Sequence, residues 1–303
     1  MSDMRVNLCG ITLKNPVITA SGTFGYGMEY QEFYPISRLG GISCKGTTLK
    51  ERPGNPAPRI AETPAGMLNS VGLQNPGVDT FLNTYLPWLK QQDTVVIANI
   101  AGNTLEDYAA MAERLSDSAV DMVELNISCP NVKQGGVNFG TSCDSVAEVT
   151  RLVKRHCAKP LMVKLTPNVT SIGDIAASAE AAGADMLSLI NTLTGMRIDI
   201  RTRRPILHNN TGGLSGPAVF PVAVRMVREV YKRVSVPVIG MGGISTWEDA
   251  AEMMIAGAAA VQVGTASFHD PYACIHIIEG MEEFAQRSGL HSITELTGTL
   301  QEW

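Results

Sequence analysis

The sequence predicts an α/β protein that folds as one domain, a (β/α)8 or TIM barrel spanning residues 1–303. Three observations carry this prediction: short apolar runs alternate with helix-like segments, there are eight of each, and no linker or change of composition divides the chain. With 45% hydrophobic residues, the chain can bury a full core. A doubly wound open sheet is the alternative, but its G-x-G-x-x-G fingerprint is missing.

The predicted strands are mostly continuous apolar runs, which are typical of parallel strands buried on both faces. They are Pro16–Ala20, Gly41–Lys45, Thr94–Asn99, Met122–Ile127, Pro160–Leu165, Asp185–Ile190, Val236–Gly240 and Ala260–Gly264. The predicted helices lie between them: Glu29–Ile36, Val78–Lys90, Thr104–Leu115, Cys143–His156, Ser171–Ala182, Pro217–Val230, Thr246–Ala256 and Pro271–Arg287. N-cap signals at Asn103–Glu106 and Ser245–Glu248 and closing glycines at Gly183 and Gly257 support these bounds.

Two connections are longer than a barrel needs. Thr47–Gly77 follows the second strand and is rich in proline, and Thr192–Gly216 follows the sixth and is rich in Arg, Asn and Gly. Long connections in a compact domain are usually functional. The prolines of Thr47–Gly77 indicate an ordered excursion over the strand ends.

Composition excludes several classes of protein. A formal charge of −5 argues against nucleic-acid binding. The N-terminus lacks a signal core, and the most apolar window, Met253–Val263, is far shorter than the ~20 residues that span a bilayer. None of the six cysteines forms a C-x-x-C pair, so no metal site is expected. The sequence thus predicts a soluble cytoplasmic protein that binds neither nucleic acid nor membrane.

Polar or glycine residues follow every predicted strand, at the end where barrels carry their active sites. They are Ser21, Lys45, Gly46, Asn99, Asn126, Cys129, Lys164, Asn191, Thr192, Gly242, Gly243, Gly264 and Thr265. Glycine-rich loops after the last two strands, Gly240–Ser245 and Gly264–Ala266, expose backbone N–H groups where barrels bind phosphate. A cofactor or substrate with a phosphate tail is therefore expected.

Lys45 and Lys164 each end an apolar strand, where a lysine needs an anionic partner. Three interpretations stay open. Either lysine could form a Schiff base in a lyase, or stabilise the negative charge of a reduced flavin. Lys164 could instead form an ion pair with Glu124 inside the barrel.

Three asparagines and one cysteine indicate the ligand and its chemistry. Asn69, Asn126 and Asn191 follow alternate strands, and their amides suit a small anionic heterocycle beside Lys45. Cys129 lies just beyond the fourth strand with no histidine in its loop to activate it as a nucleophile. A general base that removes a proton beside a carbonyl is the favoured role.

Several segments together resemble the dihydroorotate dehydrogenases, flavoprotein barrels of pyrimidine biosynthesis. They are Ala20–Gly25, Lys45–Thr48, Asn69–Asn75, Asn126–Asn131, Gly212–Pro217 and Gly240–Ile244. Lys133–Thr141 and Asn191–Asp199 resemble the NAD-linked class. That resemblance implies a complex with a second subunit that carries FAD and a [2Fe–2S] cluster, with a homodimer of this chain at the core of a heterotetramer.

The resemblance also implies a role for each site residue in oxidising (S)-dihydroorotate to orotate. Cys129 would remove the C5 proton while FMN accepts a hydride from C6. The expected cofactor-binding residues are Ser21, Lys45, Gly46, Asn99, Asn126, Lys164, Ile190, Gly216, Gly242, Gly243, Gly264 and Thr265. The expected substrate-binding residues are Lys45, Asn69, Ser70, Val71, Gly72, Leu73, Asn126, Asn191 and Thr192. Alternatives are a fumarate-reducing dehydrogenase, a Schiff-base lyase and a flavin-free binding paralogue.

Overall fold

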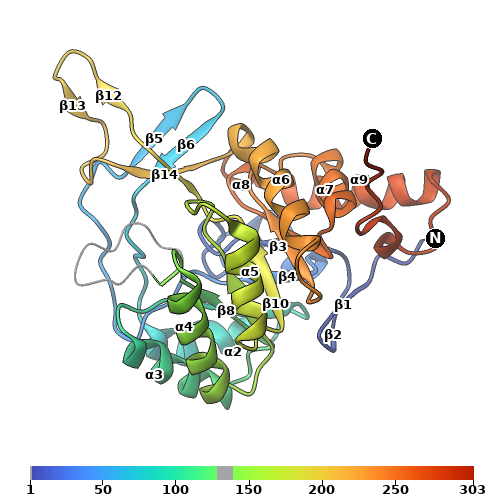
Figure 1. Cartoon of the computed structure of the whole chain (residues 1–303), viewed down its shortest axis with the longest axis horizontal. Coiled ribbons are helices and arrows are strands. Elements are labelled where there is room, and N and C mark those ends of the chain that lie inside the picture. Colours follow the sequence, from blue (N-terminus) through green and yellow to red (C-terminus); the bar gives the residue numbers. More distant parts are fainter. Residues whose placement is uncertain (1, 128–138) are drawn as a thin grey trace.

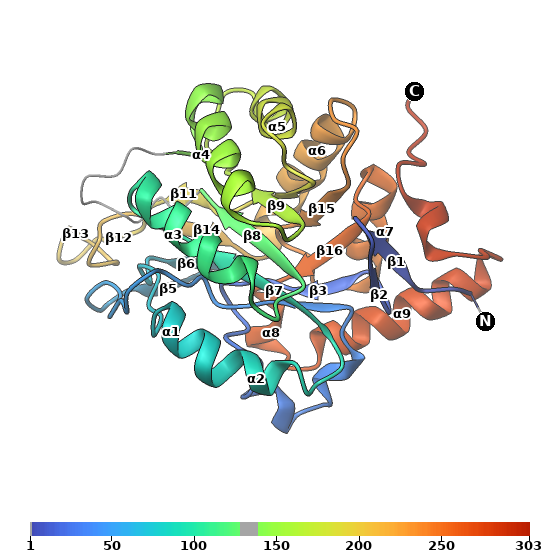
Figure 2. The ribbon, with the colours of Figure 1, turned by 90° about the horizontal axis from the view of Figure 1, so that it is seen from below.

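The computed structural model of the chain describes residues 2–127 and 139–303. Its central strands are β3 (Val17–Thr19), β4 (Gly41–Ser43), β7 (Val95–Ile100), β8 (Met122–Asn126), β9 (Leu161–Lys164), β10 (Met186–Leu189), β15 (Val238–Met241) and β16 (Ala260–Val263). They pair in parallel as a closed barrel in the order β10-β15-β16-β3-β4-β7-β8-β9 (Figure 1, Figure 2). The prediction of a barrel is confirmed, and the open sheet is excluded.

All eight predicted strands are present, within two residues of the predicted bounds. Almost every residue in them is buried, since helices cover the outside of the barrel and side chains fill its interior. Closure by β16 pairing with β3 leaves the barrel without an edge strand.

Helices surround the barrel, as Figure 2 shows. They are α1 (Val78–Thr80), α2 (Leu86–Leu89), α3 (Leu105–Ser116), α4 (Cys143–His156), α5 (Ile172–Ala181), α6 (Phe220–Tyr231), α7 (Trp247–Ala256), α8 (Ala266–His269) and α9 (Ala273–Arg287). A π-helical stretch, Phe81–Tyr85, joins α1 to α2. Thr104 and Thr246 cap α3 and α7 with their hydroxyls, as their N-cap signals predict.

One predicted helix is wrong. Glu29–Ile36 contains only the 3-10 turn Tyr30–Glu32, followed by a second turn at Ile36–Arg38. Pro35 lies between them with an extended ψ of 115°, and a proline has no N–H to donate the hydrogen bond that would continue a helix. The Tyr30 ring stacks on Phe24 at 4.0 Å and holds this segment against the barrel.

Both long connections are ordered, which was predicted for Thr47–Gly77 alone, and they pair with each other. The first contributes β5 (Ile60–Thr63) and β6 (Gly66–Asn69), and the second β11 (Leu193–Gly195) and β14 (Gly212–Ser215). Together they form an antiparallel sheet in the order β11-β14-β6-β5, called the auxiliary sheet below.

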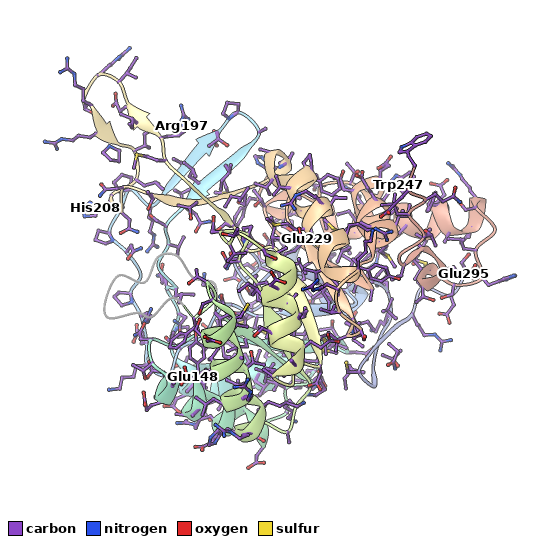
Figure 3. All side chains as sticks on the ribbon, in the orientation of Figure 1. Glu148, Arg197, His208, Glu229, Trp247 and Glu295 are labelled. Carbon is purple, nitrogen blue, oxygen red and sulfur yellow. The ribbon has the colours of Figure 1, made fainter. Side chains whose placement is uncertain are left out.

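A hairpin of β12 (Ile198–Asp199) and β13 (Arg204–Pro205) projects from the auxiliary sheet, at the upper left of Figure 1. Arg197, labelled in Figure 3, lies at its base and donates to the Glu62 carbonyl of β5 at 2.8 Å. Ile200 at the tip is 88% exposed.

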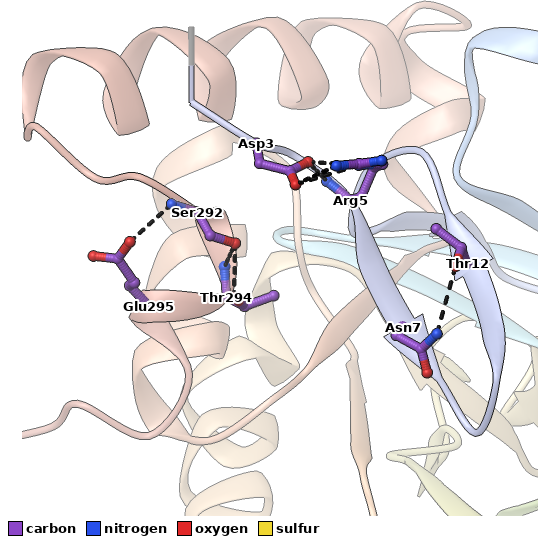
Figure 4. Close-up of polar contacts among 7 residues, drawn as sticks. All are labelled: Asp3, Arg5, Asn7, Thr12, Ser292, Thr294 and Glu295. Carbon is purple, nitrogen blue, oxygen red and sulfur yellow. Dashed lines mark hydrogen bonds and ion pairs between the residues drawn. The ribbon is translucent and has the colours of Figure 1, made fainter.

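The two ends of the chain meet on the other side of the molecule. An N-terminal hairpin pairs β1 (Val6–Leu8) with β2 (Ile11–Leu13). Just before it, the Asp3 N–H donates to the His291 carbonyl at 2.8 Å. Figure 4 shows the neighbouring contacts, where Asp3 binds the Arg5 guanidinium and Ser292 forms a capping box with Glu295. The N-terminus is thereby tied to the segment that follows α9, while Glu302 near the C-terminus binds Arg228 of α6.

Gly257 should tolerate alanine less well than another glycine with positive φ. Gly257 ends α7 with φ 134°, and a Cβ there would collide with the Tyr231 ring, whereas Gly289 has φ 68° and open space around it. Strain plus overpacking should lower the free energy of unfolding by about 3 kcal/mol in Gly257→Ala, against about 1 kcal/mol for strain alone in Gly289→Ala. Urea unfolding of both variants measures the difference, and equal losses would contradict the collision.

Candidate functional site

A cavity opens between the C-terminal ends of the barrel strands and the auxiliary sheet. Most of the site residues predicted from sequence line it: Ser21, Lys45, Gly46, Asn69, Val71, Gly72, Leu73, Asn126, Lys164, Ile190, Asn191, Thr192, Gly242, Gly243, Gly264 and Thr265. They come from every part of the chain and meet because parallel strands in a barrel end on one face. The structure thus brings the two predicted groups of residues into a single cavity.

Three predicted residues lie behind the cavity wall rather than in it. Asn99 is fully buried and donates to Glu124, and Ser70 is fully buried with no hydrogen-bond partner for its hydroxyl among the described residues. Gly216 adopts φ 98° and its carbonyl approaches Gly243. Cys129 lies outside the described residues.

Some lining residues were not predicted from sequence. They are Ala20, Gly22, Thr23, Ile60, Met67, Ser215, Met241, Gln262 and Phe268. Gln262 could have been proposed as a site residue from the sequence, since it is the one polar residue of the apolar run Ala260–Val263. Ser215 accepts a hydrogen bond from the Thr265 hydroxyl at 2.8 Å, which links β14 to the loop after β16.

Beneath the cavity, the carboxylate of Glu124 crosses the inside of the barrel. Its Oε2 accepts hydrogen bonds from Ser43 Oγ at 2.7 Å and Asn99 Nδ2 at 2.6 Å. Its Oε1 accepts from Ser188 Oγ at 2.8 Å and Gln262 Nε2 at 2.9 Å. These donors come from four strands, and β16 lies diametrically opposite β8 in the barrel. Every lone-pair direction of a buried charge is thereby used.

Lys164 supplies the nearby positive charge. It is 5% exposed, and its Nζ donates to Ser21 Oγ at 3.5 Å. Burial alone would raise the pKa of Glu124, but the charge of Lys164 and the bonds from Ser43 and Asn99 outweigh it and lower that pKa. In the described part of the chain the two side chains form no contact ion pair, so the predicted Glu124–Lys164 pair acts only through the longer-range field.

A chain of amides leads from this carboxylate up to the cavity. Asn99 donates to Glu124 and therefore turns its carbonyl oxygen toward Asn126, whose Nδ2 donates to it at 3.4 Å. A carboxylate can only accept, so its charge fixes which end of the Asn99 amide faces which neighbour. The orientation of Asn126 in the cavity wall follows from the same constraint.

No group of three or more His, Cys, Asp or Glu side chains is placed to bind a metal ion within residues 2–127 and 139–303. None of the described helices is both long and apolar enough to cross a bilayer.

Comparison with known proteins identifies the family. The sequence profile described as dihydroorotate dehydrogenase matches residues 3–285. This chain belongs to the dihydroorotate dehydrogenase family. The resemblance noted in the sequence is thus confirmed. Membership in the dihydroorotate dehydrogenase family favours redox chemistry over a Schiff-base lyase.

Curated relatives in this family match over nearly their full length. A protein of Petrotoga mobilis is 52% identical over 99% of this chain and 100% of its own. One from Alkaliphilus oremlandii is 56% identical over 98% of this chain and 99% of its own. One from Bacteroides fragilis is 53% identical over 99% of this chain and 100% of its own. Each is named the catalytic subunit of dihydroorotate dehydrogenase B (NAD(+)).

Replacing Glu124 by glutamine should destabilise the fold. The amide would present N–H groups where the carboxylate accepts, so either Asn99 or Gln262 must turn over, and Lys164 would lose its buried counter-charge. We expect a loss of about 3 kcal/mol in Glu124→Gln and about 1 kcal/mol in the control Ser188→Ala, which removes one bond and keeps the charge. Urea unfolding at neutral pH measures both losses, and a glutamine variant as stable as the control would refute the account.

The stabilising effect of Glu124 should depend on pH. Its pKa in the folded chain lies below the ordinary 4.5, so the ionised form favours folding. This contribution is complete above pH 4.5 and is lost as the pH falls from there toward the folded-state pKa. The difference in unfolding free energy between the unsubstituted chain and Glu124→Gln should therefore shrink below pH 4.5. A difference that stays constant on acidification would argue against an ionised Glu124.

Proposed function

We propose that this chain is the catalytic subunit of an NAD-linked dihydroorotate dehydrogenase. It oxidises (S)-dihydroorotate to orotate in de novo UMP biosynthesis, in one barrel domain that spans residues 1–303. The observation that carries this proposal is the full-length match, above 50% identity, to relatives that bear that name. The polar cavity at the mouth of the barrel supports it.

The cavity fits FMN by its donor set. Lys164 and Ser21 place a positive charge and a hydroxyl at the floor, and the loops Gly242–Gly243 and Gly264–Thr265 line the far side without large side chains. FMN, when bound, accepts the hydride released by the substrate. We assign it to Ser21, Lys45, Gly46, Asn99, Asn126, Lys164, Ile190, Gly216, Gly242, Gly243, Gly264 and Thr265. Asn99 and Gly216 act from behind the wall, by supporting Asn126 and the phosphate loops.

The substrate binds on the side of the cavity that faces the auxiliary sheet. Its carboxylate and imide edges need a cation and amides, which Lys45, Asn69 and Asn191 provide. We assign it to Lys45, Asn69, Ser70, Val71, Gly72, Leu73, Asn126, Asn191 and Thr192. Ser70 is buried and contributes to the shape of this segment rather than a direct bond.

Cys129 is the base that removes the C5 proton. The described lining of the cavity contains two lysines but no carboxylate, imidazole, thiol or phenol. A group that titrates near neutrality must therefore come from elsewhere, and Cys129 follows the end of β8 by three residues. A thiol, with an ordinary pKa of about 8.5, can serve once neighbouring groups tune it.

The electrons then pass to a second subunit. We propose that the partner carries FAD and a [2Fe–2S] cluster and reduces NAD, in a cytoplasmic heterotetramer built on a homodimer of this chain. The words "catalytic subunit" in the relatives' names support a partner.

Substituting Cys129 tests the proposed base. In Cys129→Ser, a hydroxyl replaces the thiol and is a far weaker base at neutral pH, so flavin reduction by dihydroorotate should slow by about 10²- to 10⁴-fold while orotate still binds. Stopped-flow absorbance of the flavin measures the rate. The matched control is Cys143→Ser, since Cys143 is exposed and does not line the cavity. Near-normal reduction by Cys129→Ser would remove the thiol from the mechanism.

The electron acceptor is tested on the isolated chain. Flavin in the purified chain should be reduced by dihydroorotate but should pass electrons neither to NAD nor to fumarate at a useful rate. Addition of the partner subunit should restore NAD reduction. Turnover with fumarate by the isolated chain would instead identify the fumarate-reducing form.

A further inference from the structure

The auxiliary sheet joins two of the proposed substrate-binding segments, Asn69 and Asn191–Thr192, in one hydrogen-bonded unit. Asn69 ends β6, and Asn191–Thr192 leads directly into β11. Strand β14 lies between them, with Gly213 in register with Asn69 on one side and with Thr194 on the other. A Cβ at Gly213 would collide with the Thr192 side chain, so Thr192 packs directly on this backbone. Whatever anchors this sheet to the barrel therefore sets the position of both segments.

One anchor, besides the Thr265–Ser215 bond, is the side-chain amide of Asn168. β11 is one of the two outer strands of the sheet, so no other strand of residues 2–127 and 139–303 pairs with its outward-facing peptide groups. Asn168 Nδ2 donates to the Thr192 carbonyl at 3.0 Å, and Asn168 Oδ1 accepts from the Thr194 N–H at 2.9 Å. The amide thus pairs with β11 as the peptide group of a further strand would. Because one end donates and the other accepts, its orientation is fixed.

Asn168 is in turn held by the barrel. Its Nδ2 also donates to Thr166 Oγ1 at 3.0 Å, and its own backbone N–H donates to the same oxygen at 3.2 Å. Thr166 is buried two residues beyond Lys164, at the end of β9. Asn168 therefore connects the end of β9, next to the floor of the cavity, to the outer wall, and it does not itself line the cavity.

We propose that Asn168 is a positioning residue that holds the Asn191–Thr192 segment against a small anionic ring bound in the cavity, and so sets the affinity for substrate and product without touching them. This inference rests on the function proposed above. Asn168 should separate substrate binding from cofactor binding, because its side-chain hydrogen bonds within the described chain reach only Thr166, Thr192 and Thr194. The loop after β16 reaches the auxiliary sheet through the separate Thr265–Ser215 bond.

Orotate and FMN titrations test this separation. In Asn168→Ala both bonds to β11 are lost, and we expect orotate to bind about tenfold more weakly, while the affinity of the flavin-free protein for FMN stays within twofold. Orotate binding is followed by the absorption change of the bound flavin. The matched control is Asn83→Ala, which removes an exposed asparagine amide outside the cavity lining and should leave both affinities unchanged.

Hydrogen–deuterium exchange provides a measurement that needs no ligand. The Thr194 amide should exchange about tenfold faster in Asn168→Ala than in the unsubstituted chain, because its acceptor is gone. Asn168→Asp keeps that acceptor but cannot donate to Thr192. The Asn168→Asp variant should therefore protect the Thr194 amide from exchange and still bind orotate weakly. If the alanine variant does not fold, the same orotate and FMN titrations are made on Asn168→Asp.

The outcomes distinguish the two proposals. If the unsubstituted chain binds neither FMN nor orotate, the proposed function is wrong. If it binds both and Asn168→Ala matches Asn83→Ala in orotate affinity, the positioning role is wrong. A parallel fall in both affinities, together with a lower unfolding midpoint, would also overturn it, since that pattern indicates a general structural role.

Discussion

A single buried carboxylate organises the inside of this barrel. Barrel interiors are usually filled with branched aliphatic side chains, which cost no desolvation of charge. Here Glu124 accepts four hydrogen bonds from four strands and faces the charge of Lys164. Apolar packing would stabilise the fold at least as well. The polar interior supports the cavity above it, because the Glu124 carboxylate fixes the orientation of Asn99 and, through it, of Asn126.

Much of the fold could be predicted from sequence because its signals are local. Parallel strands buried on both faces give continuous apolar runs, and all eight predicted strands are present. The predicted helix at Glu29–Ile36 is absent because Pro35 interrupts it. The auxiliary sheet could not be predicted, since its strands are short, rich in glycine and paired over great sequence separation. Asn69 and Gly213, for example, are 144 positions apart.

The same distinction applies to the site. Residues at strand ends, such as Lys164 and Asn126, were predictable because a barrel places all such ends on one face. Residues that act on the site only through other residues could not be predicted from the sequence. Ser188 and Gln262 lie within apolar strands, and nothing local indicates that both donate hydrogen bonds to the Glu124 carboxylate. Asn168 looks like an ordinary loop asparagine until the edge of β11 is placed beside it.

Closure of the barrel also affects when this chain can fold during its synthesis. β3 near the start of the chain must wait for β16, some 240 positions later, before the ring is complete. Until translation delivers that last strand, β3 and β15 both expose unsatisfied peptide groups, which can recruit strands from other nascent chains. Folding is therefore expected to follow synthesis rather than accompany it, with the ligand pocket acquired last.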